Sequence, residues 1–393
     1  MGLTRVDSLL SDTRTHKPLS LTDLCEDVIL LICSHLDCMR ADKETPLKSL
    51  CLTNRHLHSI LVPCLFKTIH TNRPISQLAP TTLAAQYAHT FRLDMFGSLW
   101  WWCSGAYTSS SDALDLFHCI QGLPRVRALE VSMMRRSIDM FSAAFSTPSE
   151  QDFNLSGIQS LVATSSAAFL VNHCPNLRRL EIRDESACLL ETYTDLSARL
   201  APLRNAPTSP HPPLLTHFDA TATWSADEVS FVVQTFPRLE SLRMRSDTYT
   251  YRASTPIIMA ILSAHLARIK TLHLVKSGSL GMGYQSIWTR LIHASSNDEY
   301  RQTLWRDNER LRVTVENNIV RDAFRQMPSL RTCWLGEKRV ARKCAADHDG
   351  WWMWERERRS KDMDNDSCIM GKGRIASLRM EKEAVVVRSE MAC

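Results

Sequence analysis

Residues 226–244 have the sequence ADEVSFVVQTFPRLESLRM, which joins a helical pattern to a strand pattern through a proline. The apolar residues within 226–235 have the spacing of one helix face. Pro237 stops that helix and favours an extended backbone at the entry to the next segment. Leu242 and Met244 then alternate with polar residues, as in a short strand with one buried face. The stretch therefore predicts a helix, a proline turn and a short strand.

The strand part of this unit has the pattern φ-x-x-φ-x-φ, in which φ is an apolar residue and x any residue. This pattern recurs between residues 86 and 336. Its copies start at Val126, Ile158, Leu177, Leu215, Leu239, Ile269 and Leu330, and Phe91–Leu93 is a weaker earlier copy. Helical apolar spacing precedes several copies, at 113–120, 167–173, 226–235, 256–266 and 319–326. Such segments run into a proline just before the strand, at Leu123-Pro124, Cys174-Pro175, Phe236-Pro237 and Met327-Pro328. Repetition of helix, proline and short strand predicts an α/β solenoid over 67–336, with a parallel sheet on one side and helices on the other.

The array resembles irregular leucine-rich repeats. The fourth positions of the motif stand at 129, 161, 180, 218, 242, 272 and 333, so their intervals are 32, 19, 38, 24, 30 and 61 residues. Regular repeats keep to about 20–29 residues. An ordinary α/β domain is the alternative that these irregular periods leave open.

In such an array, the strand residues between the buried ones point to a common face. They are Glu130, Arg179, Glu181, Arg183, Arg243, Arg245, His273 and Trp334. Arginine and tryptophan are typical anchors of protein interfaces, so we expect this face to bind a protein substrate. The alternative is that the charges are merely solvated.

Three short helical patterns lie between residues 21 and 70. Asp23 followed by Glu26 has the form of an N-cap. The apolar stripe of the first pattern comprises Leu24, Val28, Leu31, Ile32 and Leu36. A polar break at 37–46 precedes a second short helix at 47–51. The third is expected to end at Pro63 and at the β-branched residues after Phe66.

Residues 24–36, LCEDVILLICSHL, resemble the first helix of an F-box, and residues 47–60, LKSLCLTNRHLHSI, resemble its second and third. The resemblance covers residues 20–66. Cys25 stands where the family usually has proline, and Leu57 where it usually has tryptophan. A generic three-helix cap on the repeats is the alternative.

The resemblance implies a substrate-receptor subunit of a Skp–cullin–F-box ubiquitin ligase. In that family the three helices bind a Skp-type adaptor, and through it a cullin, while the repeats hold the target protein. The receptor itself performs no chemistry and needs no cofactor or metal. The positions implied in adaptor contact are Leu24, Val28, Ile29, Ile32, Leu36, Leu50, Leu57 and Leu61. Some of these residues must form the core of the three helices themselves. A non-ligase protein-binding repeat scaffold with an F-box-like cap is the second hypothesis for the whole chain.

Composition narrows the possible partners. The chain has 393 residues and a net charge of +5, without a concentrated basic patch, so we expect no nucleic-acid partner. No apolar run approaches 18 residues, and residues 1–20 lack the apolar core of a secretory signal, so we expect no membrane segment. The 13 cysteines contain no C-x-x-C pair, which favours reduced thiols in the cytoplasm or nucleus. No nucleotide-binding or hydrolase motif is present, so we do not expect an enzyme.

The ends of the chain complete this organisation. We expect residues 1–19 to be a flexible N-terminus and 337–393 to be a charged, partly disordered tail. Trp351, Trp352 and Trp354 lie next to a charged run, which predicts one helical turn that docks back on the array.

Overall fold

The computed structural model describes residues 21–38, 46–71, 82–94, 110–133, 141, 143, 154–183, 200, 214–246, 251–284, 298–337, 339–343 and 352–356. The chain divides into two compact units, Met1–Phe66 and Lys67–Cys393. The predicted flexible N-terminus at 1–19, and the tail after residue 356, lie outside the described residues.

The first unit is helical. It contains a 3₁₀ turn, η1 (Leu21–Asp23), and the helices α1 (Glu26–Cys38), α2 (Pro46–Cys51) and α3 (Arg55–Phe66). The helices pack on one another. Their common core consists of Ile29, Cys33, Leu47, Cys51, Leu57, Ile60, Leu61 and Val62.

Two predicted helix ends differ from the structure. Asp23 ends the 3₁₀ turn, and α1 begins only at Glu26, where the carbonyl of Cys25 accepts the first helical hydrogen bond from the amide of Ile29. Pro63 does not end the third helix but lies inside α3. Proline removes one helical hydrogen bond, and burial of the apolar face beside it outweighs that loss.

The second unit is built on an 11-stranded sheet whose spatial order equals the chain order. Its strands are β1 (Thr68–Thr71), β2 (Thr90–Asp94), β3 (Ala128–Ser132), β4 (Ser160–Thr164), β5 (Arg179–Arg183), β6 (His217–Ala222), β7 (Ser241–Ser246), β8 (Thr271–Leu274), β9 (Thr332–Leu335), β10 (Arg339–Lys343) and β11 (Trp352–Arg356). Strands β1 to β9 are parallel, and β10 and β11 are added antiparallel. The predicted α/β class and parallel, solenoid-like arrangement are confirmed.

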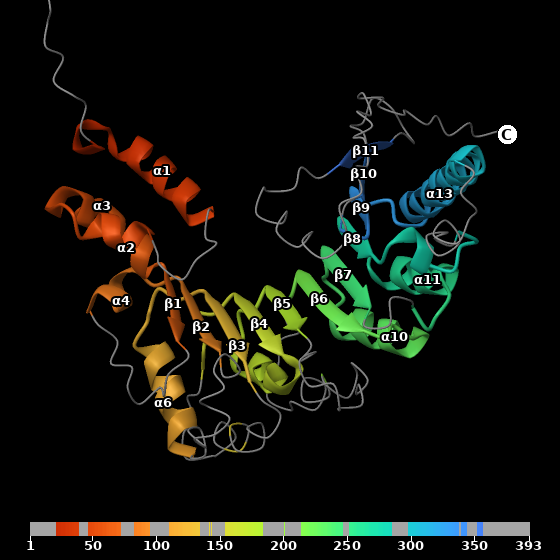
Figure 1. Cartoon of the computed structure of the whole chain (residues 1–393). Coiled ribbons are helices and arrows are strands. Elements are labelled where there is room, and N and C mark those ends of the chain that lie inside the picture. The colour runs from red at the N-terminus through yellow and green to blue at the C-terminus, as the bar shows by residue number, and fades with distance from the viewer. Residues whose placement is uncertain are drawn as a thin grey trace, which may run out of the picture. The chain divides into compact units, whose positions relative to one another are not determined.

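The described helices of this unit are α4 (Thr82–Tyr87), α6 (Ser110–Gln121), η4 (Ser165–His173), α10 (Ala226–Thr235), α11 (Thr255–His265), η5 (Ser277–Ser279) and α13 (Asp298–Gln326). Figure 1 shows α10, α11 and α13 side by side along the same part of the sheet, and α10 packs on α11 as α11 packs on α13. The segment predicted at 167–173 is a 3₁₀ helix rather than an α-helix. The helix predicted at 319–326 is only the end of the 29-residue α13.

The apolar motif forms a straight row across the sheet. The fourth position of each copy pairs in register with that of the next copy, and the row continues into the two strands before it. Its members are Ile69, Phe91, Leu129, Leu161, Leu180, Phe218, Leu242, Leu272 and Cys333. From Phe91 onward every member is buried. The weak copy at Phe91–Leu93 is therefore a full strand of the array.

The prolines lie in a recurring turn between helix and strand. The carbonyls of Leu123, Cys174, Phe236, Leu266 and Met327 each accept a hydrogen bond from the amide three residues later, at 3.0–3.3 Å. Proline stands at the second position of four of these turns, where its fixed φ suits a β-turn. Ala267 replaces it in the fifth.

The same pair of hydrogen bonds recurs where each strand begins and connects it to the start of the following strand, a place that we call the strand entrance. The carbonyls of residues 67, 89, 127, 159, 178, 216, 240 and 270 each accept two consecutive amides of the following strand, at 2.7–3.1 Å. This pairing sets the register before the strand begins, whatever the length of chain between two strands.

The C-terminal end departs from the predicted tail. Beyond residue 336, β10 and β11 still belong to the sheet. The helical turn predicted near Trp351 is wrong, because Trp352 starts β11. Residues two apart share a face of a strand but not of a helix. Trp352 and Trp354 both contact α13: Trp352 packs on Phe324, and Trp354 donates its indole N–H to Asn317 at 2.9 Å.

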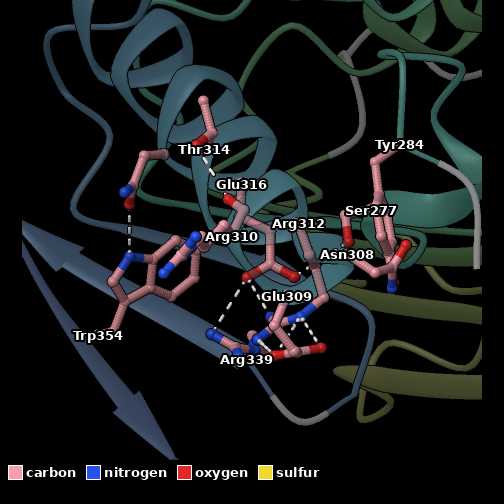
Figure 2. A network of polar contacts seen from close by, with 11 residues as sticks. Ser277, Tyr284, Asn308, Glu309, Arg310, Arg312, Thr314, Glu316, Arg339 and Trp354 are labelled. Atoms are coloured by element: carbon pink, nitrogen blue, oxygen red, sulfur yellow. Dashed lines mark hydrogen bonds and ion pairs between the residues drawn. The ribbon is translucent and has the colours of Figure 1, made fainter. Parts of the chain in front are cut away.

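A buried carboxylate joins the elements at this end (Figure 2). Glu316 of α13 accepts hydrogen bonds from Arg312 at 2.7 Å and from Ser277 at 3.0 Å. It also pairs with Arg339 of β10 at 3.1 Å, and Arg339 lies over the Trp354 ring. The network therefore links η5, α13, β10 and β11.

None of the described helices is both long enough and apolar enough to cross a lipid bilayer. Cys25, Cys33, Cys51, Cys64, Cys119, Cys174 and Cys333 are free thiols. Burial raises the pKa of Cys174 and of Cys333 to about 12, so both are protonated packing groups.

Replacement of Glu316 tests the network. We expect Glu316→Ala to lower the free energy of unfolding by about 3 kcal/mol, because the largely buried Arg312 loses one of its two carboxylate partners. Buried Ser277 also loses its acceptor, and the partly exposed Arg339 loses an ion pair. Urea unfolding followed by circular dichroism measures the loss. In the control Asp307→Ala, an exposed carboxylate that pairs with exposed Arg310 is lost, and the expected change is below about 0.5 kcal/mol. Equal losses in the two variants would contradict this assignment.

Candidate functional site

The strand residues that alternate with the buried row form a second surface, which we call the open face. Its central row pairs in register across nine strands. The row consists of His70, Arg92, Glu130, Val162, Glu181, Asp219, Arg243, His273 and Trp334. Five predicted substrate-binding residues belong to it, namely Glu130, Glu181, Arg243, His273 and Trp334. Arg179 precedes the row, and Arg183 and Arg245 follow it.

An arginine–carboxylate cluster, formed by Glu181, Arg183, Asp219, Arg243 and Arg245, lies on β5, β6 and β7. Arg245 binds Asp219 with two hydrogen bonds, Nε to Oδ1 at 2.8 Å and Nη2 to Oδ2 at 2.7 Å. The same Nη2 donates to Glu181 at 2.8 Å, and Arg183 donates to Glu181 at 3.0 Å. Arg243 lies 3.7 Å from Asp219. Three consecutive strands are thereby joined through their side chains.

The cluster stays charged near neutral pH. Burial alone raises the pKa of Glu181, but hydrogen bonds and charges from Arg245 and Arg183 outweigh it and hold the pKa below its usual value. Burial likewise lowers the pKa of Arg245, but Asp219 and Glu181 raise it further than burial lowers it. Glu181 and Arg245 are therefore ionised near neutral pH.

The arginines are the accessible part of this cluster. Only 18% of the Asp219 side chain is exposed, against 37% of Arg243 and 44% of Arg183. With three guanidinium groups and two carboxylates, the cluster carries a surplus positive charge. A ligand that approaches it meets guanidinium groups first.

Asp219 was missed among the predicted substrate-binding residues. It stands between Phe218 and Ala220 in its copy of the motif, just as Arg243 stands between Leu242 and Met244. The motif alone could therefore have placed it on the open face.

Next to the cluster lies an aromatic pair, His273 and Trp334. The two rings stack at 5.0 Å between centroids and 6° between planes. Burial, and secondly the charge of Arg243, lower the pKa of His273 to about 4. The imidazole is therefore neutral near pH 7 and offers a flat, uncharged surface with Trp334.

Two aromatic side chains hydrogen-bond the backbone of β7, the strand that carries Arg245. Trp224 is fully buried, has a φ of 50°, and donates its indole N–H to the carbonyl of Arg245 at 2.6 Å. Tyr251 donates to the carbonyl of Met244 and accepts the amide of Val275, both at 2.9 Å. These two aromatic residues fix the end of β7 that carries Arg245.

The first unit presents a different surface, on α1. Ile29 and Cys33 face the core of the three helices. Val28, Leu31 and Ile32 form a second apolar face of α1, which we call the α1 patch; Val28 is 39% and Leu31 58% exposed, and the half-buried Leu24 precedes the helix. A helix of a small bundle needs only one apolar face for its own core.

The predicted adaptor-binding residues divide between these surfaces. Ile29, Leu57 and Leu61 lie in the core of the unit. Val28 is exposed, whereas Leu24, Ile32 and Leu50 are half-buried. The side chain of Leu36 lies outside the described residues. Leu31 and Leu52, both exposed, were absent from the prediction, although Leu31 continues the i, i+4, i+7 spacing from Leu24.

Comparison with known proteins adds no family to these observations. No protein-family model matches the chain, and no curated protein matches it significantly. Within the described residues, no three histidine, cysteine or acidic side chains gather as a metal site. The charged and aromatic open face and the α1 patch are surfaces suited to binding other macromolecules.

The depressed pKa of His273 has a consequence for stability. In the unfolded chain this histidine takes up a proton near pH 6.5, whereas in the folded chain it does so near pH 4. The free energy of unfolding should therefore fall as the pH is lowered between these values, and His273→Phe should remove that part of the loss, about 1 to 2 kcal/mol between about pH 7 and about pH 5. Urea unfolding of both chains at the two pH values measures it. Parallel losses in wild type and variant would contradict the burial of a neutral imidazole.

Proposed function

We propose that the chain is the substrate-recognition subunit of a Skp–cullin–F-box ubiquitin ligase. The helices of residues 20–66 bind a Skp-type adaptor, and through it a cullin, while the open face binds the protein to be ubiquitylated. The subunit is not catalytic: it raises the effective concentration of target lysines near the ubiquitin-conjugating enzyme.

The observation that carries this proposal is the second apolar face of α1. Val28 and Leu31 are exposed on the helix whose sequence resembles the first F-box helix, while Ile29 and Cys33 supply its core contacts. Exposed aliphatic side chains at i and i+3 form a continuous strip along one side of a helix. Such a strip is suited to packing against a partner helix.

The open face supports the second half of the proposal. It brings arginines, carboxylates and a stacked tryptophan from distant parts of the sequence onto one surface of a sheet. Arginine and tryptophan are enriched among the residues that dominate binding energy at protein interfaces.

A non-ligase repeat scaffold with an F-box-like cap would use the same open face. It differs in one respect, since it has no Skp-type adaptor as a partner. Adaptor binding therefore separates the two functions.

The α1 patch is tested by a pull-down with a purified Skp-type adaptor. We expect the wild-type chain to capture the adaptor, and Val28→Asp/Leu31→Asp to bind it roughly a hundredfold more weakly or worse, because two carboxylates enter an apolar contact unpaired. Both positions are exposed, so circular dichroism should show an unchanged fold.

The matched control is Leu214→Asp/Ile257→Asp, which places two aspartates at exposed aliphatic positions of the second unit. It should bind the adaptor like the wild type. Failure of a well-folded wild-type chain to capture the adaptor would exclude the ligase function and leave the scaffold.

A further inference from the structure

We infer that the arginine–carboxylate cluster and the aromatic pair bind an extended acidic segment of the target protein. The inference rests on the proposed role of the open face in target binding. It does not require that the first unit binds an adaptor.

The donors available to such a segment belong to three arginines. Within the part of the chain that the structure describes, the guanidinium of Arg179 makes no hydrogen bond or ion pair, although its backbone amide belongs to the sheet. Among the described residues, the guanidinium of Arg243 makes only long ion pairs, at 3.7 Å to Asp219 and 3.9 Å to Glu337. Arg183 bonds Glu181 through Nε, and within the described ranges its two terminal amino groups make no hydrogen bond or ion pair that would compete with a ligand. Each guanidinium has five N–H donors and matches a carboxylate with two parallel hydrogen bonds.

A basic ligand fits the same place poorly. Asp219 and Glu181 already accept short hydrogen bonds from Arg245 and are less exposed than the arginines around them. A lysine would have to displace Arg245 from both carboxylates while lying among like charges. The charges therefore favour an acidic partner.

The spacing of the strands favours an extended chain. Adjacent strands lie about 4.8 Å apart, so a segment that crosses from β5 to β9 spans about 19 Å, or about six extended residues. Arg243, His273 and Trp334 pair in register on three consecutive strands. A ligand with acidic residues over the cluster therefore reaches the aromatic pair with an apolar residue at its end.

Single-stranded nucleic acid is a weaker candidate. Its phosphates follow one another along the whole strand, and Glu181 and Asp219 stand between the arginines in this cluster. Some phosphates would therefore lie against carboxylates, whereas a peptide can place its acidic residues only where the arginines are.

The test uses the full chain and a fluorescein-labelled peptide of about ten residues, with three glutamates on one side and a single tryptophan. Fluorescence anisotropy compares it with peptides in which glutamine or lysine replaces each glutamate, and with a ten-nucleotide oligothymidine. We expect the glutamate peptide to bind about tenfold or more tightly than the glutamine peptide, and the lysine peptide not to bind.

Two double variants locate the site. Arg179→Ala/Arg243→Ala should weaken binding of the glutamate peptide about tenfold or more, because two charge-assisted contacts are lost. Arg125→Ala/Arg238→Ala removes the same charge from exposed turns before β3 and β7 and should leave binding unchanged. Trp334→Ala should weaken the peptide with tryptophan but not one with glycine in its place.

Equal binding of the glutamate and glutamine peptides, no binding, equal losses in the two arginine variants, or tighter binding of the oligonucleotide would each overturn the inference. A chain that binds the glutamate peptide through Arg179 and Arg243 but captures no adaptor would keep this inference and lose the ligase function. Adaptor capture without peptide binding would overturn this inference and keep the ligase function.

Discussion

The apolar row that starts at Ile69 and ends at Cys333 constrains the whole second unit, because each of its residues must meet the same position of the neighbouring strand. Side chains of a strand alternate between faces, so a shift by one residue would move arginines and glutamates into the core and leucines out of it. The paired hydrogen bonds at each strand entrance prevent that shift. The burial of the apolar row therefore fixes where each side chain of the open face lies. Because of this, Glu181 accepts a hydrogen bond from Arg245, which stands 64 positions later in the chain.

The features that could be predicted from sequence are those set by local pattern. The strand copies alternate over a few residues, and the helix at 226–235 has both an apolar face and a following proline. The structure adds a capping box at its start, where Ser225 and Glu228 bond each other's backbone amides. Elements that depend on distant contacts escaped prediction. The first turns of α13 are polar and exposed, and β10 and β11 need each other and β9 to satisfy their backbone hydrogen bonds.

The same distinction holds for the two candidate surfaces. The open face could be predicted because the motif determines which strand positions are buried, and the same alternation places Asp219, between Phe218 and Ala220, on that face. The division of α1 could not be predicted. Both faces of that helix are apolar, so periodicity alone cannot tell Ile29, which is buried, from Val28, which is exposed.

The hydrogen bonds at the strand entrances also bear on how such a chain tolerates change in length. The spacing between successive parallel strands of this sheet varies from 19 to 61 residues, yet the register stays the same. Closing a loop becomes costlier only with the logarithm of its length, so the longest interval costs about 1 kcal/mol more than the shortest. Segments can therefore be inserted or removed between two strands at little thermodynamic cost. The binding surface can keep its composition while the loops beside it diverge.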